Sequence, residues 1–306
     1  MRGDPASRIP DDIPRQAMIE AIPFFAQERY QCGPAAMAMA LQWSGVETVP
    51  EELLPMVYTP GRKGSLQPGL VTAARRNGRL AYAITGLTSL LRETAAGRPV
   101  IVLQNLGLGW LPRWHYAVVI GYDLNLSSIV LHSGGRAARS VSLRTFLYTW
   151  QRADQWGLLV LPPGTMPVCP EAVSYLEAAL GLQQAGDAGA AVKAFRAAAD
   201  RWPENVAVFM ALGNALYIER SLPESVRAFE RAVHLDPDNG DALNNLAHLL
   251  AETGNYERAQ TMARRALAAG GAHREVYLRT LREIVGAPQS LHRPAASIAI
   301  PSGSDP

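Results

Sequence analysis

Cys32 is the strongest candidate nucleophile in the sequence, and it stands directly before a run of residues expected to form a helix. Ala, Met and Leu fill Ala35–Leu41, and Pro34 suits a first helical turn. A thiol at a helix N-terminus lies at the positive end of the helix dipole, which lowers its pKa and favours the reactive thiolate. We therefore predict a nucleophilic Cys32, although a lone cysteine is often a small buried hydrophobe.

A cysteine nucleophile needs a general base, and His115 is the best candidate among six histidines. It begins the most apolar strand pattern of the chain, from which its side chain can point into a cleft and reach a thiol. The alternative is a strand histidine whose ring is satisfied by a backbone carbonyl. Gln27, five residues before Cys32, could direct its side-chain amide at the oxygen of a carbonyl under attack, together with the backbone N–H of Cys32.

Helix and strand signals alternate between residues 22 and 161, which predicts an α+β domain with a leading helix and an antiparallel sheet. The expected helices are Cys32–Trp43, Glu51–Val57, Pro68–Arg76, Ser89–Ala96 and Leu143–Arg152. The expected strands are Leu80–Thr85, Val100–Gln104, His115–Tyr122, Ser128–His132 and Gly157–Leu161.

The second half of the chain repeats itself every 34 residues. The repeated pairs are Phe195 and Phe229, Ala198 and Ala232, and Pro203 and Pro237. This is the tetratricopeptide period, in which each unit is a pair of helices. We predict an all-α solenoid of three repeats at 172–205, 206–239 and 240–273, with a closing helix up to residue 285.

The remaining segments set the expected domain limits. Residues 1–20 are expected to be irregular, the α+β domain spans 21–162, and the Pro-rich residues 163–171 form a linker with few contacts. The tail 286–306 is rich in Pro, Ser and Ala and is expected to be disordered. The two halves are therefore expected to fold separately.

Composition excludes several classes of function. The net charge of +2 favours neither nucleic acid nor an acidic substrate as a partner. Two cysteines, Cys32 and Cys169, form neither a disulfide framework nor a metal motif, so no metal or cofactor is expected. No apolar run could cross a membrane, and no export signal is recognisable at the N-terminus. The chain as given is expected to be cytoplasmic, or periplasmic if an export signal has been lost.

Three motifs carry a resemblance to a known family: IPFFAQERYQCGPAAMAMAL, GRPVIVLQNL and WHYAVVIGYD. With them, residues 22–161 resemble the bacterial papain-like cysteine peptidases of the bacteriocin-processing, double-glycine leader type. More narrowly, they look like stand-alone relatives followed by tetratricopeptide repeats. The resemblance implies that Cys32 is the nucleophile, His115 the general base and acid, and Gln27 the oxyanion-hole side chain. Papain-like enzymes usually place this Gln six residues before the Cys, whereas the gap here is five.

The third catalytic member departs from the family pattern. Leader peptidases carry an Asp at the end of the strand that follows the base, where this chain has His132 and Ser133. Asp123 lies eight residues beyond His115, about 26 Å away in an extended strand, and is typical of a turn residue. The orienting role is left open among Ser133, His132 and Asp123, with a backbone carbonyl as a further possibility.

The sequence thus predicts a cysteine peptidase that cleaves a peptide or protein, with the repeats recruiting substrate or a protein partner on their concave face. Two alternatives stay open: a catalytically weak or inactive papain-like binding module, and an acyltransferase with the same thioester chemistry. Trp110 and Trp114 lie in a Gly/Trp/Pro loop just before His115 and are predicted to form a wall of the substrate cleft. The alternative is that both tryptophans fill the core.

Overall fold

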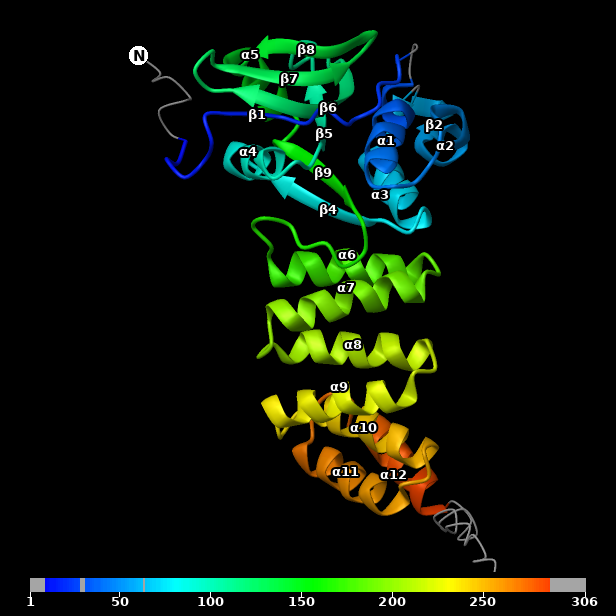
Figure 1. The fold of residues 1–306 in the computed structure, drawn as a ribbon. Coiled ribbons are helices and arrows are strands. Elements are labelled where there is room, and N and C mark those ends of the chain that lie inside the picture. The colour runs from blue at the N-terminus through cyan, green and yellow to red at the C-terminus, as the bar shows by residue number, and fades with distance from the viewer. Residues whose placement is uncertain (1–8, 28–30, 63, 287–306) are drawn as a thin grey trace, which may run out of the picture. The chain divides into compact units, whose positions relative to one another are not determined.

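The structure is a computed structural model that describes residues 9–27, 31–62 and 64–286 (Figure 1). Its internal contacts divide it into two compact units, Met1–Arg201 (unit 1) and Trp202–Pro306 (unit 2). We describe each unit by itself. Most of the tail predicted to be disordered, residues 287–306, lies outside the described residues.

Within the described part of unit 1, seven antiparallel strands form one sheet. Its order is β4-β9-β5-β6-β7-β8, and β1 also pairs with β6. The strands are β1 (Gln16–Met18), β4 (Leu80–Thr85), β5 (Val100–Asn105), β6 (Trp114–Asp123), β7 (Ser128–Ser133), β8 (Arg136–Ser142) and β9 (Trp156–Leu161). A separate small hairpin pairs β2 (Tyr58–Thr59) with β3 (Gly64–Ser65).

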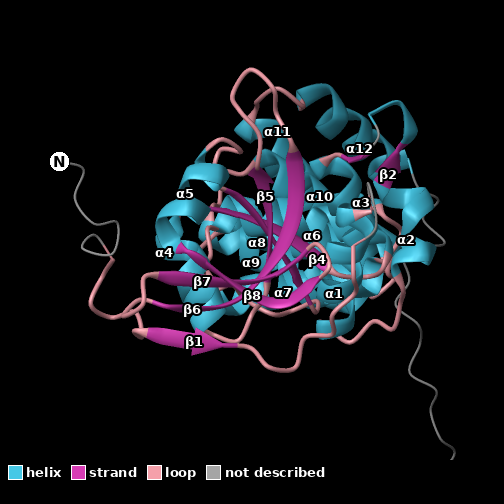
Figure 2. Ribbon diagram, turned by 90° about the horizontal axis from the view of Figure 1, so that it is seen from above, coloured by secondary structure: helices cyan, strands magenta, loops and turns pink. Residues whose placement is uncertain are grey.

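Helices cover both faces of this sheet. They are α1 (Cys32–Trp43), α2 (Pro50–Val57), α3 (Gln67–Arg76), α4 (Leu87–Ala95) and α5 (Leu143–Gln151), with a short 3-10 turn at Pro60–Arg62. Figure 2 shows α1, α2 and α3 gathered on one side of the strands and α4 and α5 on the other. The uncharged sequence of α1 explains its position, because Met37, Met39 and Leu41 are fully buried against the sheet. Burying each such side chain contributes about 1.5–3 kcal/mol.

All the helices and strands expected between residues 22 and 161 occur, with ends within two residues of the prediction. Four strands, β1, β2, β3 and β8, were not predicted from the sequence. β8 is an edge strand whose residues are nearly all exposed, so its sequence has no apolar alternation to reveal it. β1 falls in the N-terminal stretch expected to be irregular, where Gln16–Met18 instead pairs with the end of β6. The hairpin of β2 and β3 is too short to leave a sequence signal.

The segment 163–171 makes more contacts than expected of a linker. The backbone N–H of Val168 donates to Glu93 at 2.6 Å, and that of Glu171 donates to the Tyr82 hydroxyl at 3.1 Å. The next helix, α6 (Ala172–Gln184), packs on β4 through the fully buried Tyr175. Consequently α6 and α7 (Ala188–Arg201) fall in the same compact unit as the sheet. The predicted domain limits stay a prediction.

Unit 2 consists of helices at the predicted repeat spacing. They are α8 (Val206–Ile218), α9 (Leu222–Leu235), α10 (Gly240–Glu252), α11 (Tyr256–Ala269) and α12 (Arg274–Gly286). The first helices of successive repeats start 34 residues apart, since 240 − 206 = 34 and 274 − 240 = 34. Helix pairs therefore occur at the predicted 34-residue spacing, and α12 lies where the closing helix is expected. α6 starts 34 residues before α8, so the first repeat lies in unit 1.

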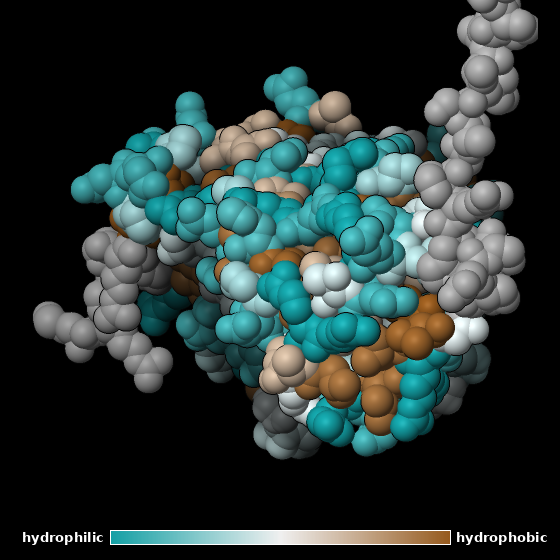
Figure 3. Space-filling model, turned by 90° about the horizontal axis from the view of Figure 1, so that it is seen from below, coloured by the Kyte–Doolittle hydropathy of each residue, from teal (hydrophilic) through white to brown (hydrophobic). Residues whose placement is uncertain are grey.

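Small residues let the paired helices of unit 2 approach closely. A methyl group on Gly213 of α8 would lie 2.8 Å from the ring of Phe229 on α9. Ser225 of α9 donates its hydroxyl hydrogen to the Gly213 carbonyl at 2.7 Å. The surface visible from below is mainly hydrophilic, with limited hydrophobic areas (Figure 3). No helix in the described ranges is both long and apolar enough to cross a membrane.

Candidate active site

Four of the predicted site residues come together where β6 begins. β7 pairs with β6 only from Val118 onward, so the first residues of β6 have no β7 neighbour. Cys32, the first residue of α1, occupies this place, and its sulfur accepts a hydrogen bond from the backbone N–H of Tyr116. Tyr116 directly follows His115, so the thiol and the candidate base both lie at the start of β6.

The imidazole of His115 has a partner at the end of β7. Its Nε2 lies 2.9 Å from the hydroxyl oxygen of Ser133, which is buried. Ser133 is one of the three residues left open by the sequence for the orienting role. The structure brings this residue, and not the other two, to the ring of His115.

His132 and Asp123 are held elsewhere. Nδ1 of His132 accepts a hydrogen bond from the Ala138 backbone at 3.0 Å, and its Nε2 faces the Ile22 carbonyl at 3.4 Å. Asp123 accepts hydrogen bonds from the backbone of Asn125 and Leu126 and so stabilises the turn between β6 and β7. The hydrogen bonds of both side chains are made to backbone groups and not to His115.

Gln27 joins the start of β6 to the turn after β7. Its backbone N–H donates to the Gly134 carbonyl at 3.0 Å, and its side-chain Oε1 accepts from the Gly134 N–H at 2.9 Å. The side-chain Nε2 donates to the Tyr116 carbonyl at 3.3 Å. The amide is therefore fixed beside Cys32. One of its two Nε2 hydrogens is used by Tyr116, which leaves the other for a ligand.

Burial raises the pKa of the Cys32 thiol above its ordinary value. Hydrogen bonds from the backbone of Tyr116, Gly33 and Cys32 act in the opposite direction but are outweighed. The expectation of a lowered pKa for this thiol is therefore wrong. The N–H groups at the helix start do stabilise the thiolate. The free-energy penalty of withdrawing the thiolate from water is larger than this stabilisation.

Burial, with a smaller contribution from the positive charges of Arg113 and Arg139, lowers the pKa of His115 to about 4. A base with this pKa is uncharged at neutral pH. The resting site thus holds a neutral thiol and a neutral imidazole instead of a thiolate–imidazolium ion pair.

The loop before His115 is exposed. Trp110 is 80% exposed and Trp114 is 52% exposed, so the alternative that both tryptophans fill the core is wrong. The base of the loop is anchored, because the buried Asn105 accepts hydrogen bonds from the backbone N–H groups of Gly107 and Arg113. A role for either tryptophan in substrate binding stays a prediction.

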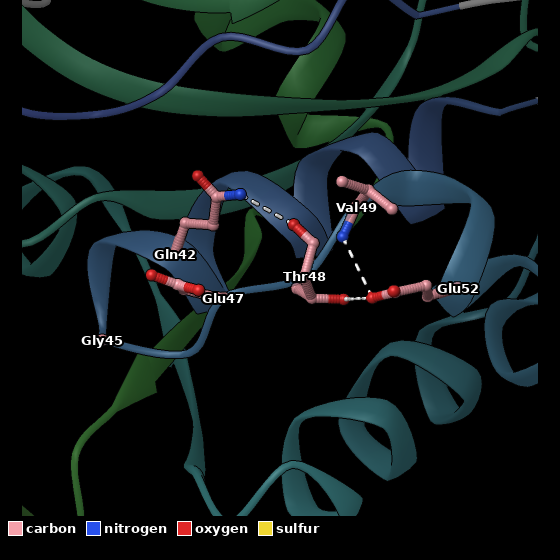
Figure 4. A pocket seen from close by; sticks show the side chains of 6 residues that line it. All are labelled: Gln42, Gly45, Glu47, Thr48, Val49 and Glu52. Carbon is pink, nitrogen blue, oxygen red and sulfur yellow. Dashed lines mark hydrogen bonds between the residues drawn. The ribbon is translucent and has the colours of Figure 1, made fainter.

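The pocket drawn in Figure 4 lies at the other end of α1, about 16 Å along the helix axis from Cys32. Its polar groups are used in joining α1 to α2. Gln42 donates to the Thr48 carbonyl at 2.8 Å, and the Thr48 hydroxyl donates to Glu52 at 3.0 Å. We assign this pocket no part in the chemistry.

Two contributors to the site could not be found from the sequence. Tyr116 acts through its backbone N–H and C=O, which no side-chain pattern reveals. Gly134 likewise binds Gln27 only through its backbone. Within the described ranges, no group of three or more His, Cys, Asp or Glu residues could hold a metal ion.

Unit 2 contains a second pocket of about 400 Å³ on helices α8, α9, α10 and α12. It is lined by Asn214, Tyr217, Phe229, Asn244, Asn245, His248, Leu249, Val276, Arg279, Thr280 and Glu283. Asn245 donates to Asn214 at 3.4 Å, and the side-chain oxygen of the buried Asn244 has no hydrogen-bond partner within the described residues. Unused amide groups of this kind can bind a peptide backbone.

Comparisons with known proteins agree with this architecture. Residues 19–157 match the Peptidase_C39 like family, and residues 176–240 and 228–261 match tetratricopeptide repeat families. The chain joins a C39-like peptidase region to tetratricopeptide repeats. No curated protein matches it.

Solved structures give similar matches to the two parts. A C39-like peptidase from Bacillus anthracis is 17% identical, with a TM-score of 0.42 over 48% of this chain and 98% of that one. The TPR2B domain of yeast Sti1, in a complex with pHsp70, is 19% identical, with a TM-score of 0.36 over 38% of this chain and 96% of that one. The first TPR of Spaghetti (RPAP3), bound to an Hsp90 peptide, is 16% identical, with a TM-score of 0.35 over 38% and 90%.

Proposed function

We propose that this protein is a cysteine peptidase in which Cys32 attacks a peptide carbonyl with His115 as general base and acid. The observation that carries the proposal is that the backbone of Tyr116 adjoins the Cys32 sulfur, so that Cys32 and His115 both lie at the start of β6. The C39-like family match over residues 19–157 supports the same assignment.

The chemistry follows from a neutral thiol beside a neutral imidazole. The Cys32 sulfur bonds to the carbonyl carbon while its proton passes to His115. His115 then gives that proton to the leaving amine as the C–N bond breaks, and a thioester remains. Water, deprotonated by His115, attacks the thioester; the C–S bond breaks, the thiolate takes back the proton, and a carboxylic acid is released.

Neighbouring groups fit the remaining roles. Ser133 engages Nε2 of His115, which leaves Nδ1 as the ring nitrogen available to the Cys32 thiol. In that arrangement Nε2 carries the hydrogen and donates it to the Ser133 oxygen. The second Nε2 hydrogen of Gln27 and the backbone N–H of Cys32 would bind the carbonyl oxygen as it gains negative charge.

We further propose that the repeats recruit the substrate or a protein partner. The pocket on unit 2 supports this role, because Asn244 offers an unused buried oxygen and Asn214, Asn245 and His248 lie on its wall. Replacing Asn245 and His248 with Ala should reduce cleavage of a recruited protein substrate. The rate of alkylation of Cys32 by a small reagent should stay unchanged.

A catalytically weak or inactive binding module is the second candidate, and a specific observation favours it. Ser133 is neutral, so it stabilises a charged His115 less than the carboxylate that the leader peptidases use. The raised pKa of Cys32 and the lowered pKa of His115 further reduce the resting fraction of ion pair. Measured turnover decides between the two candidates.

The test is cleavage of a library of tryptic peptides, with new termini identified by mass spectrometry. We expect cuts with the wild-type protein that vanish in Cys32→Ala and His115→Gln and persist in Cys169→Ser, since Cys169 is the other free cysteine. Identical peptide sets from wild type and Cys32→Ala would refute peptidase activity. Transfer of the acyl group to an added amine, without hydrolysis, would indicate an acyltransferase.

A further inference from the structure

Positive charge is concentrated in the part of the chain that builds the candidate site. Residues 105–153 contain five arginines and one acidic residue, Asp123. Asp123 is the last residue of β6, whereas His115 stands at the start of that strand. The net charge of +2 for the whole chain conceals this local excess.

Strand register places two of these arginines near His115. Arg136 on β8 is the partner of Ser133 on β7, and Ser133 contacts His115 at 2.9 Å. Directly opposed residues share one face of a sheet, so Arg136 lies on the face of Ser133.

Arg139 reaches the same face by a different path. It pairs with Leu131 on β7, and Leu131 pairs with Val119 on β6. Val119 and His115 are four residues apart on β6 and therefore share a face. Arg113, two residues before His115, and Arg139 both act electrostatically on the imidazole, which agrees with their placement. We call Arg113, Arg136 and Arg139 the arginine rim.

The arginine rim has no counter-ion of its own. All three side chains are exposed, and none forms an ion pair with a carboxylate in the described ranges 9–27, 31–62 and 64–286. Elsewhere in the same unit, the partly exposed Arg92 does find a partner, Asp12, at 2.8 Å. Three unpaired guanidinium groups near one edge of the sheet attract anions, and their planar fork binds carboxylates in particular.

Resting on the proposed peptidase function, we propose that the arginine rim binds a carboxylate side chain of the substrate, so that the enzyme prefers peptides with Asp or Glu close to the scissile bond. The position of the rim beside His115 favours a substrate group over a distant docking partner. An anionic membrane surface is the competing occupant.

The first experiment compares iodoacetate with iodoacetamide, an anionic and a neutral reagent for Cys32, at pH 7.5. We expect Arg136→Gln/Arg139→Gln to slow iodoacetate about threefold or more and to change the iodoacetamide rate less than twofold. The control Arg144→Gln/Arg282→Gln removes the same charge at exposed sites outside the rim and should change neither rate. An equal effect on both reagents, or no effect, would overturn the proposal.

The second experiment uses the tryptic peptide library. We expect Asp and Glu to be enriched within a few residues of the cut, and the enrichment to disappear in Arg136→Gln/Arg139→Gln but not in the control. Cys32-dependent cuts without acidic enrichment would overturn this inference alone, whereas no Cys32-dependent cut would overturn the peptidase function as well. Loss of binding to vesicles of phosphatidylcholine and phosphatidylglycerol in the rim variant, without acidic enrichment, would assign the rim to a membrane instead.

Discussion

At the scale of single residues, Cys32 and His115 show how burial acts on the two candidate catalytic side chains. The helix start supplies N–H groups to the sulfur, and Ser133 supplies a hydrogen-bonding partner to the imidazole. Both side chains are nevertheless largely withdrawn from water, which disfavours the charged form of each. Both directions of pKa shift favour the neutral forms, and under the proposed function proton transfer would accompany attack on the substrate.

The raised pKa of Cys32 gives a first prediction. Alkylation of Cys32 by iodoacetamide should be slow at pH 7 and should still be rising above pH 9, because only the thiolate reacts. The rate is measured by mass spectrometry of the Cys32 peptide, with the same peptide from unfolded protein as reference. A rate that is constant between pH 5 and pH 8 would instead reveal a preformed ion pair.

The lowered pKa of His115 predicts a loss of stability in acid. Unfolded histidine binds a proton below about pH 6.5, whereas folded His115 binds one only near pH 4, so between these values the unfolded state holds more protons. Stability should fall as the pH falls from 6.5 to 4. His115→Gln should remove at most about 3 kcal/mol of this dependence, measured by urea unfolding at each pH.

The matched control for this measurement is His234→Gln, at an exposed position on α9. It should leave the pH dependence close to that of the wild type. If His115→Gln and His234→Gln gave the same curve, the low pKa assigned to His115 would be wrong.

Ser133 offers a third prediction. Ser133→Asp places a carboxylate beside His115 and should raise the pKa of this imidazole by one unit or more. The pH profile of Cys32 alkylation should then gain a reactive limb between pH 5 and pH 8. Ser133→Ala removes the partner without adding charge and should lack this limb. Identical profiles in the two variants would show that residue 133 does not act on the base.

At the scale of elements, the helix pair α8–α9 shows why small residues recur in the repeats. Replacing glycine with alanine inside a helix usually stabilises it by about 1 kcal/mol. At Gly213 the added methyl group would lie 2.8 Å from the ring of Phe229, so packing outweighs propensity. Small residues therefore occur at the positions where the paired helices pack most closely.

Gly213→Ala should destabilise the repeats by about 1–3 kcal/mol, followed by the loss of helical circular dichroism in urea. Gly286→Ala is the control, because a methyl group there meets no atom within 4 Å. Adding Phe229→Leu should recover part of the loss by making room. A stabilising Gly213→Ala would mean that the two helices adjust at little cost.

At the scale of the whole molecule, the first repeat belongs with the sheet. Tyr175 and Leu182 of α6 are fully buried, and the Tyr82 and Tyr175 rings lie 6.4 Å apart. A truncation inside residues 163–171 would expose these side chains of α6 or leave their contact surface on β4 open. The compact unit instead ends at Arg201.

We therefore expect residues 1–201 to melt cooperatively and to keep the wild-type rate of Cys32 alkylation by iodoacetamide. Residues 1–165 lack α6 and should melt at a lower temperature, because β4 loses the side chains that cover it. Calorimetry of the two truncated chains provides the comparison. Equal melting temperatures of the two truncated chains would mean that the first folded unit ends in the segment 163–171, as the sequence predicts.

The sequence by itself determined the helices and most strands, the 34-residue repeats and the candidate pair of Cys32 and His115. These features are local or periodic, so apolar spacing and turn residues reveal them. The sequence also identified Gln27 as a candidate. The structure shows this residue beside Cys32. Its catalytic role stays a prediction.

Only the tertiary structure decided which groups surround the pair. Ser133 meets His115, and Arg136 lies across from Ser133, because β6, β7 and β8 pair in one register that is set by long-range packing. The direction of the pKa shifts likewise depends on how far each group is withdrawn from water. A helix-start motif cannot predict this, because burial is a property of the assembled fold.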